Sequence, residues 1–231
     1  MSAATMGSRA AASASGPTTT AQHAVDGLRR ELVSGHLAPG DRVRQEELAE
    51  SLGVSLAPVR EALAILEQEG QVTYLPRRGY FVTELDIADM REIYELRGLL
   101  EERAARHALP LLDEDAIGRI DLAARECIDA AAEGDIAAEL AANRRFHFGI
   151  LGSPDQVHTL RLIRLLWDST ETYRALYYNS PAARDESAHA HDLILAAIHR
   201  RDAKRLMAEM AAHREAALER LAEILDPREA R

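Results

Sequence analysis

The sequence predicts a mainly α protein with two parts: a small N-terminal domain of helices with a β-hairpin wing, and a C-terminal antiparallel all-α bundle of about six helices. Apolar residues recur every three or four positions along most of the 231 residues, and Gly, Pro or Ser interrupts each run. Aromatic residues are only 4% of the chain, and the clearest strand-like run lies at residues 80–82. With 47% hydrophobic residues, a chain of this length can bury two modest cores.

The first segment, residues 1–20, is rich in Ala, Ser, Thr and Gly and has no helical periodicity. It also lacks the apolar core of a signal peptide, so we expect a disordered tail. From residue 21 apolar residues repeat at helical spacing as far as Val33, and residues 34–35 (Ser-Gly) end this helix. A tight turn over 37–41 then leads into a short extended segment at 42–44.

Residues 45–69 read as two helices joined by a turn, the arrangement of a helix-turn-helix. Gly53 permits the positive φ that ends the first helix. Ser55 is placed as the N-cap of the second helix, and Pro58 falls in its first turn, where a missing N–H costs little. The apolar face of the second helix then leaves the opposite face free to enter a DNA groove.

A basic hairpin follows the two helices. Arg77 and Arg78 fall between Tyr74 and the strand-like run 80–82, with Gly79 making the turn, so they are placed as the tip of a wing on a DNA backbone or minor groove. The alternative is an ordinary solvated hairpin. The candidate DNA-binding residues of this domain, residues 21–84, are Arg42, Arg44, Ser55, Arg60, Arg77, Arg78 and Gly79.

Arg60 lies near the start of the second helix, the end that usually reaches base edges in such motifs. Its alternative is a surface ion pair with a carboxylate such as Glu61 or Glu67. The whole chain has a net charge of −10, and residues 21–84 contain seven Arg against ten Asp or Glu. Attraction to DNA must therefore come from local clustering of arginines, and we expect it to be sensitive to salt and strengthened by dimerisation.

From residue 86 onward the sequence predicts helices alone, in a domain that extends to residue 226. We expect helices at about 87–108, 114–132, 135–151, 155–178, 183–200 and 202–225. No run is long or apolar enough to span a membrane. Bundles of this kind build ligand or metal cavities from polar side chains that point inward from facing helices.

Four polar residues could form such a cavity: Asn143, His147, His191 and His213. Asn143 and His147 are four apart and share one helix face, and the other two histidines lie beside apolar stripes. Three imidazoles and an amide oxygen suit a divalent transition metal, with Zn favoured and Ni, Co or Mn as alternatives. A lone histidine on a helix is more often hydrogen-bonded within the protein or exposed to solvent than bound to a metal. We assign this structural role to the remaining six histidines. These are His23, His36, His107, His158, His189 and His199.

The N-terminal domain resembles the winged helix-turn-helix of the GntR family of bacterial transcription regulators. The resemblance is carried by LRRELVSGHLAPGDRV, EELAESLGVS, PVREALAILEQEG and RRGYFV, which together cover the whole domain. It implies binding of double-stranded operator DNA. The chain departs from the family after GVS, where relatives commonly carry Arg and then Thr but this sequence has Leu56 and Ala57. The operator sequences of the family are therefore not assigned to this protein.

The second domain resembles the FCD effector-binding domain of the FadR subfamily. The matching segments are 95–97 with Glu101, then 143–147, 191–198 and 210–213. The resemblance implies that Asn143, His147, His191 and His213 hold a divalent ion that anchors a small organic acid. An amide in place of a carboxylate at Asn143 leaves the site with one less negative charge. Arg97 is implied as an effector-binding residue, and its alternative is an ordinary i,i+4 pair with Glu101.

These parts together predict a cytoplasmic DNA-binding transcriptional regulator that is not an enzyme. A homodimer would place two recognition helices on a pseudo-palindromic operator, and effector binding would reorient the winged domains through a hinge at 84–86. The expected role is a repressor released by its effector. Two alternatives are a regulator for which the ion itself is the signal, and a metal-dependent hydrolase or lyase.

Overall fold

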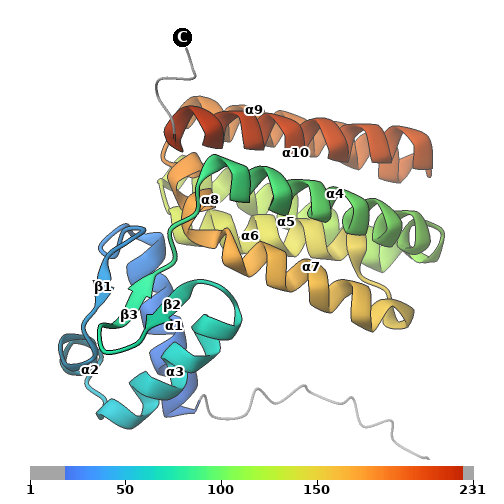
Figure 1. The fold of residues 1–231 in the computed structure, drawn as a ribbon. Coiled ribbons are helices and arrows are strands. Elements are labelled where there is room, and N and C mark those ends of the chain that lie inside the picture. Colours follow the sequence, from blue (N-terminus) through green and yellow to red (C-terminus); the bar gives the residue numbers. More distant parts are fainter. Residues whose placement is uncertain (1–18, 226–231) are drawn as a thin grey trace, which may run out of the picture.

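The computed structural model describes residues 19–225 of the chain, which form helices and one small antiparallel sheet (Figure 1). The first helix, α1 (Thr20–Val33), is capped by Thr19, whose hydroxyl accepts a hydrogen bond from the Gln22 amide at 3.1 Å. The predicted disordered tail otherwise lies outside the described residues. Its last two residues belong to the cap and first turn of α1.

The helix-turn-helix consists of α2 (Gln45–Leu52) and α3 (Leu56–Gln68). Gly53 ends α2 in the left-handed conformation with φ 65°, as the sequence predicts. Ser55 occupies the N-cap position of α3 with an extended backbone, but its side chain makes no capping hydrogen bond. The Ser55 hydroxyl, which is exposed, therefore remains free for an external acceptor.

The wing is a three-stranded sheet in the order β1-β3-β2, formed by β1 (Arg42–Val43), β2 (Val72–Leu75) and β3 (Gly79–Val82). Both strand pairs are antiparallel. The β2–β3 turn requires positive φ at Arg77 (65°) and Gly79 (96°). A left-handed conformation is costly for a residue with a Cβ, so the turn holds the Arg77 side chain at the tip against local backbone preference.

A closed apolar core joins α1, α3 and the sheet. Val25, Leu28 and Leu32 from α1 pack against the inner face of α3, and Val72 and Val82 close the core from the sheet. The buried side of each helix follows the 3.6-residue repeat of the sequence, which is why the pattern located these helices.

The C-terminal part contains long antiparallel helices stacked side by side (Figure 1). They are α4 (Ile87–Ala108), α5 (Glu114–Glu133), α6 (Ile136–Leu151), α7 (Val157–Ser169), α8 (Glu171–Tyr178), α9 (Pro181–His199) and α10 (Ala203–Leu225), with 3₁₀ turns at Leu109–Leu111 and Pro154–Gln156. The predicted bounds agree to within two residues except in one segment. Within the part of the chain that the structure describes, no helix combines the length and apolar character needed to cross a membrane.

The exception is the helix predicted over 155–178, which is divided into α7 and α8, so that residues 86–225 contain seven α-helices and not six. At Thr170 the backbone leaves the helical region, with φ −108° and ψ 7°. The Trp167 carbonyl at the break accepts hydrogen bonds from the Thr170 hydroxyl (3.2 Å) and from Arg174 Nη1 (2.8 Å). In a continuous helix this carbonyl would accept a backbone N–H, and here the two side chains provide hydrogen bonds in its place. The hydrophobic pattern of the sequence gives no sign of these hydrogen bonds.

The linker between the two parts is held in place where it enters α4. Asp86 and Asp89 form a capping box at the start of α4. The preceding residue, Leu85, donates its backbone N–H to the Tyr173 hydroxyl on α8 at 2.7 Å. Because α8 also packs against α1, this short helix contacts both the linker and the N-terminal domain.

Candidate functional site

Three histidines from three helices meet in the centre of the bundle. His147 lies on α6, His191 on α9 and His213 on α10, and one nitrogen from each lies within 4.8 Å of the others. Their ring centroids form a nearly equilateral triangle with sides of 5.1 to 5.4 Å. Chelation of one ion requires this convergence, and helical spacing alone could not establish it.

The polar atoms of this cluster lack partners. The Asn143 Oδ1, the His147 Nδ1 and both ring nitrogens of His191 are buried, and none makes a hydrogen bond within the protein. A buried polar atom without a partner costs about 1–3 kcal/mol, so four such atoms together call for a bound group. The donor set therefore fits a cation.

The three imidazoles are kept neutral. Burial lowers the pKa of His147, and the nearby His213 and His191 lower it further. Burial likewise lowers the pKa of His191, and burial together with the charge of Arg97 lowers that of His213 to about 4. Neutral imidazole is the form that binds metal, so at neutral pH these rings are ready to act as ligands.

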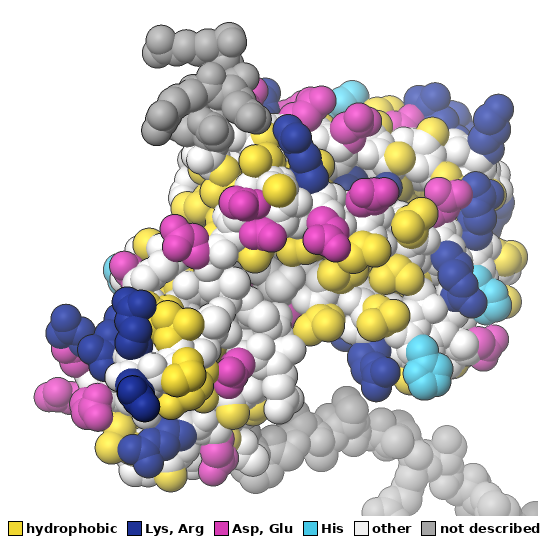
Figure 2. Space-filling view, viewed as in Figure 1, with side chains coloured by type: hydrophobic (Ala, Val, Ile, Leu, Met, Phe, Trp, Pro, Cys, Tyr) yellow, Lys and Arg dark blue, Asp and Glu magenta, His cyan; other side chains and the backbone are white. Residues whose placement is uncertain are grey.

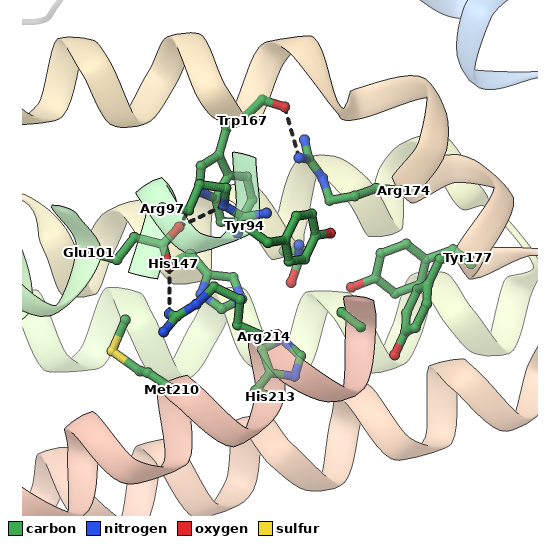
Figure 3. A pocket seen from close by; sticks show the side chains of 13 residues that line it. Tyr94, Arg97, Glu101, His147, Trp167, Arg174, Tyr177, Met210, His213 and Arg214 are labelled. Carbon is green, nitrogen blue, oxygen red and sulfur yellow. Dashed lines mark hydrogen bonds and ion pairs between the residues drawn. The ribbon is translucent and has the colours of Figure 1, made fainter. Parts of the chain in front are cut away.

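Arg97 lies beside the histidines and is only 5% exposed. Its Nε donates to Glu101 Oε1 at 2.9 Å, so the i,i+4 pair exists, but it is buried and lines the cavity (Figure 3). Glu101 also accepts from Trp167 Nε1 (2.7 Å) and from Arg214 Nη1 (3.2 Å). The predicted i,i+4 pair is thus present but is buried and not solvated: Glu101 holds the guanidinium, and the Arg97 Nη1 remains without a partner.

The cavity continues from the histidines toward α8. Further lining residues are Tyr94, Asn143, Trp167, Arg174, Tyr177, Tyr178, Met210 and Ala217. Only about 30 Å³ is open to the centre of a water-sized sphere, which is room for one or two waters. A compact ligand of few atoms is therefore the kind that enters with the smallest side-chain movement.

The predicted ligands and Arg97 are brought together, whereas the six histidines assigned to other roles are all exposed. Sequence reasoning missed Arg174, Trp167 and Arg214. The only signal for Arg174 was its position between Tyr173 and Tyr177 on one short helical segment. Arginine is normally a surface residue, so that signal favoured a solvated face.

The predicted DNA-contacting arginines are exposed at the outer end of the N-terminal domain, where Figure 2 shows basic side chains gathered. Arg60 Nε donates to Gln45 Oε1 at 3.2 Å, and no ion pair to the predicted alternatives Glu61 or Glu67 is formed. Arg44 pairs with the exposed Glu47 at 2.8 Å. The guanidinium of Arg78 lies 5.0 Å from the Phe81 ring. Only weak surface contacts thus hold these side chains in the free protein.

Comparison with protein families gives two matches. Residues 20–82 match the model described as bacterial regulatory proteins, gntR family, and residues 92–216 match the FCD domain. The chain belongs to the GntR family and carries an FCD domain. It is therefore a DNA-binding transcriptional regulator, which confirms the resemblance and the fold class inferred from the sequence.

Individual relatives agree with this assignment. The regulator is 30% identical over 176 residues to the Nta operon transcriptional regulator of Aminobacter aminovorans, covering 74% of this chain and 80% of that protein. It is 28% identical over 177 residues to the McbR regulator of Escherichia coli, covering 76% and 80%. The solved structure of E. coli McbR/YncC superposes with a TM-score of 0.79 at 25% identity, covering 90% of this chain and 99% of that one.

Proposed function

We propose that this regulator binds a pseudo-palindromic operator as a homodimer, represses transcription, and is released when a small organic acid binds at a divalent metal ion in the bundle. The observation that carries the proposal is the cluster of buried, unpartnered polar atoms on Asn143, His147 and His191, each of which offers one ligand atom, with His213 closing the ring. Three imidazoles and an amide oxygen favour Zn, with Ni, Co or Mn as alternatives.

When bound, the ion would supply a Lewis-acidic anchor for a carboxylate. Since Asn143 brings no charge, the ion's positive charge would be uncompensated by any of its four protein ligands, and the affinity for an anion would rise accordingly. The unpartnered Nη1 of Arg97 lies in the same cavity and is suited to donate a hydrogen bond to the same carboxylate. The protein's own contribution is thus to position one guanidinium beside the neutral imidazoles.

The proposed homodimer rests on an exposed apolar surface over α4 and α7, which pack side by side. We call it the leucine face; its residues are Leu96, Leu99, Leu162 and Leu165, which are 42% to 67% exposed. Yellow side chains gather over this region in Figure 2. One copy of the chain carries one recognition helix and reads one half-site of the operator. An operator with two half-sites therefore requires a second copy of the chain, and we propose that this copy covers the leucine face.

A route from the cavity to the DNA-binding domain runs through α8. Arg174 on this helix lines the cavity, and the adjacent Tyr173 accepts the hydrogen bond from Leu85 in the linker. A ligand that shifts α8 therefore acts on the linker directly. A ligand favours the state that binds it better, and we assign that state the lower affinity for DNA.

The first test is the metal content of protein purified without chelator, measured by plasma mass spectrometry. We expect about one transition-metal ion per chain, retained in His189→Ala and lost in His191→Ala. The two residues lie on the same helix, but His189 is exposed and His191 is buried. Comparing the two variants therefore distinguishes the removal of a metal ligand from the removal of a histidine that is not a ligand. Wild-type protein that is purified without bound metal and then takes up no added Zn, Ni or Mn would refute the metal site.

A second test uses a DNA fragment selected by the protein from a random library, with affinity measured by fluorescence anisotropy at fixed salt. Metal alone should leave DNA affinity unchanged, and metal with a small carboxylate should lower it. A change caused by metal alone would favour the ion as the signal. Conversion of the carboxylate, followed by proton NMR, would instead favour an enzyme.

A further inference from the structure

The second arginine of the cavity, Arg174, is buried without a carboxylate partner. It is 7% exposed, and its Nη1 donates to the Trp167 carbonyl (2.8 Å) and to the Thr170 hydroxyl (2.9 Å), both neutral groups. Its Nε is buried and has no hydrogen-bond partner (Figure 3). Arg97 differs, because one of its nitrogens is paired with Glu101.

The electrostatics of the two guanidinium groups differ accordingly. Burial lowers the pKa of Arg97, but Glu101 and Tyr94 together outweigh this effect, so the pKa is raised. For Arg174, burial lowers the pKa, Glu171 opposes this only partly, and the positive charge of Arg97 adds to the lowering. An arginine stays protonated in proteins, so the buried charge of Arg174 is one that the protein leaves under-compensated.

The charge of the whole cavity points the same way. Its lining carries three arginines, Arg97, Arg174 and Arg214, against the single carboxylate of Glu101, a formal excess of two positive charges with neutral histidines. Glu101 is engaged by Arg97, Arg214 and Trp167 and makes no hydrogen bond to Arg174. A buried excess of this kind is stabilised by an anion.

We propose that the effector is a compact organic dianion, with one anionic group held at the histidine cluster and Arg97 and the second held by Arg174. This inference rests on the proposed function and adds to it the chemical class of the effector. A monocarboxylate would leave Arg174 without a counter-ion, whereas a dicarboxylate satisfies the free Nε–H of Arg174 and the free Nη1 of Arg97. Arg174 is then the residue that determines specificity.

The test measures binding to the Zn-loaded protein by isothermal titration calorimetry. The probes are acids of equal carbon number: malonate against propionate, succinate against butyrate, and glutarate against valerate. We expect at least one dicarboxylate to bind about tenfold or more tighter than its partner, the scale of one added charge-assisted hydrogen bond. Metal content is measured again after each titration, because dicarboxylates can extract zinc.

Variants assign the preference to its residue. Arg174→Gln should abolish the preference for the dicarboxylate while leaving monocarboxylate affinity within about threefold. Thr170→Val is the matched control: it removes a neutral partner of Arg174 at the α7–α8 break and should keep the preference. If Arg174→Gln fails to fold, the wild-type comparison and Arg174→Lys, which should retain only part of the preference, still decide.

The outcomes separate the two proposals. Zn-dependent binding of monocarboxylates with no dicarboxylate preferred would overturn the dianion inference and leave the proposed function intact. Equal loss of both acid classes in Arg174→Gln would also overturn it, because the arginine would then act only through the fold. If no acid binds with or without zinc, the carboxylate-effector function fails, and the inference fails with it.

Discussion

Replacing Glu101 with Gln tests the charge arrangement on which the cavity is built. Glu101 is 2% exposed and is the counter-ion of Arg97 (2.9 Å) and Arg214 (3.2 Å). Gln keeps the size and can still accept from Trp167, but it removes the charge and turns an amide donor toward one of the guanidinium groups. Removing one partner of a buried ion pair costs about 3–5 kcal/mol, and we expect Glu101→Gln to lower the free energy of unfolding by this amount.

The assay is urea unfolding of chelator-treated protein, followed by the fluorescence of Trp167. This is the single tryptophan of the chain, and it lies in the network itself. The control is Glu102→Gln, which removes an exposed i,i+4 pair with Arg106 (2.7 Å) and should cost less than about 1 kcal/mol. Equal destabilisation by the two variants would refute the reasoning that burial makes Glu101 different.

The same network predicts a pH dependence. Burial raises the pKa of Glu101, but the charges of Arg97 and Arg214 outweigh it, so the net pKa lies below the ordinary 4.5. A lowered folded-state pKa gives stability that is fully present above 4.5 and is lost as the pH falls below that value toward the folded-state pKa. Glu101→Gln should therefore flatten the stability curve of the chelated protein in this acidic range.

Three further changes probe the dimer, the wing and the linker. Leu99→Asp on the leucine face should convert the proposed dimer to monomer in analytical ultracentrifugation, whereas Leu122→Asp on α5, also exposed, should not. Arg77→Ala should weaken operator binding and reduce the slope of log affinity against log salt concentration by roughly 1. An unchanged slope would show that this arginine makes no phosphate contact. Tyr173→Phe removes the acceptor of the Leu85 N–H and should speed exchange of that amide and weaken ligand-induced DNA release; unchanged release would exclude this route.

The fold could be predicted from the sequence wherever local rules decide it. Gly53 adopts the left-handed conformation that ends α2, and α4 covers the predicted range 87–108 because Asp86 and Asp89 cap it. Burial of His191 could also be anticipated, because it lies beside an apolar stripe. In these cases a property of a few neighbouring residues fixes the outcome, which is the information a single sequence contains.

What could not be predicted depends on contacts between distant residues. The break at Thr170 is stabilised by the side chain of Arg174. The sequence shows there only five polar residues, 168–172, which the solvent-facing side of a continuous helix could also carry. The role of Arg174 was missed for the same reason: periodicity places arginine on a surface, and only the packing of α8 against α6, α9 and α10 buries it. The role of Glu101 as a counter-ion for two arginines depends on Arg214, which lies 113 positions away in the sequence but beside it in the fold.

In the proposed mechanism, the division of α7 from α8 gives the cavity a wall that can move. Successive side chains on a helix point about 100° apart, so the adjacent Tyr173 and Arg174 reach different surroundings: the linker on one side and the cavity on the other. In a continuous helix over 155–178 any shift of Arg174 would have to displace the buried Ile163 and Trp167 of α7 from the bundle core. Because α8 is a separate helix of eight residues, the proposed ligand at Arg174 would move it against the linker while α7 stays packed. Sequence reasoning that joins the two helices therefore misses the proposed route to the DNA-binding domain as well as the break.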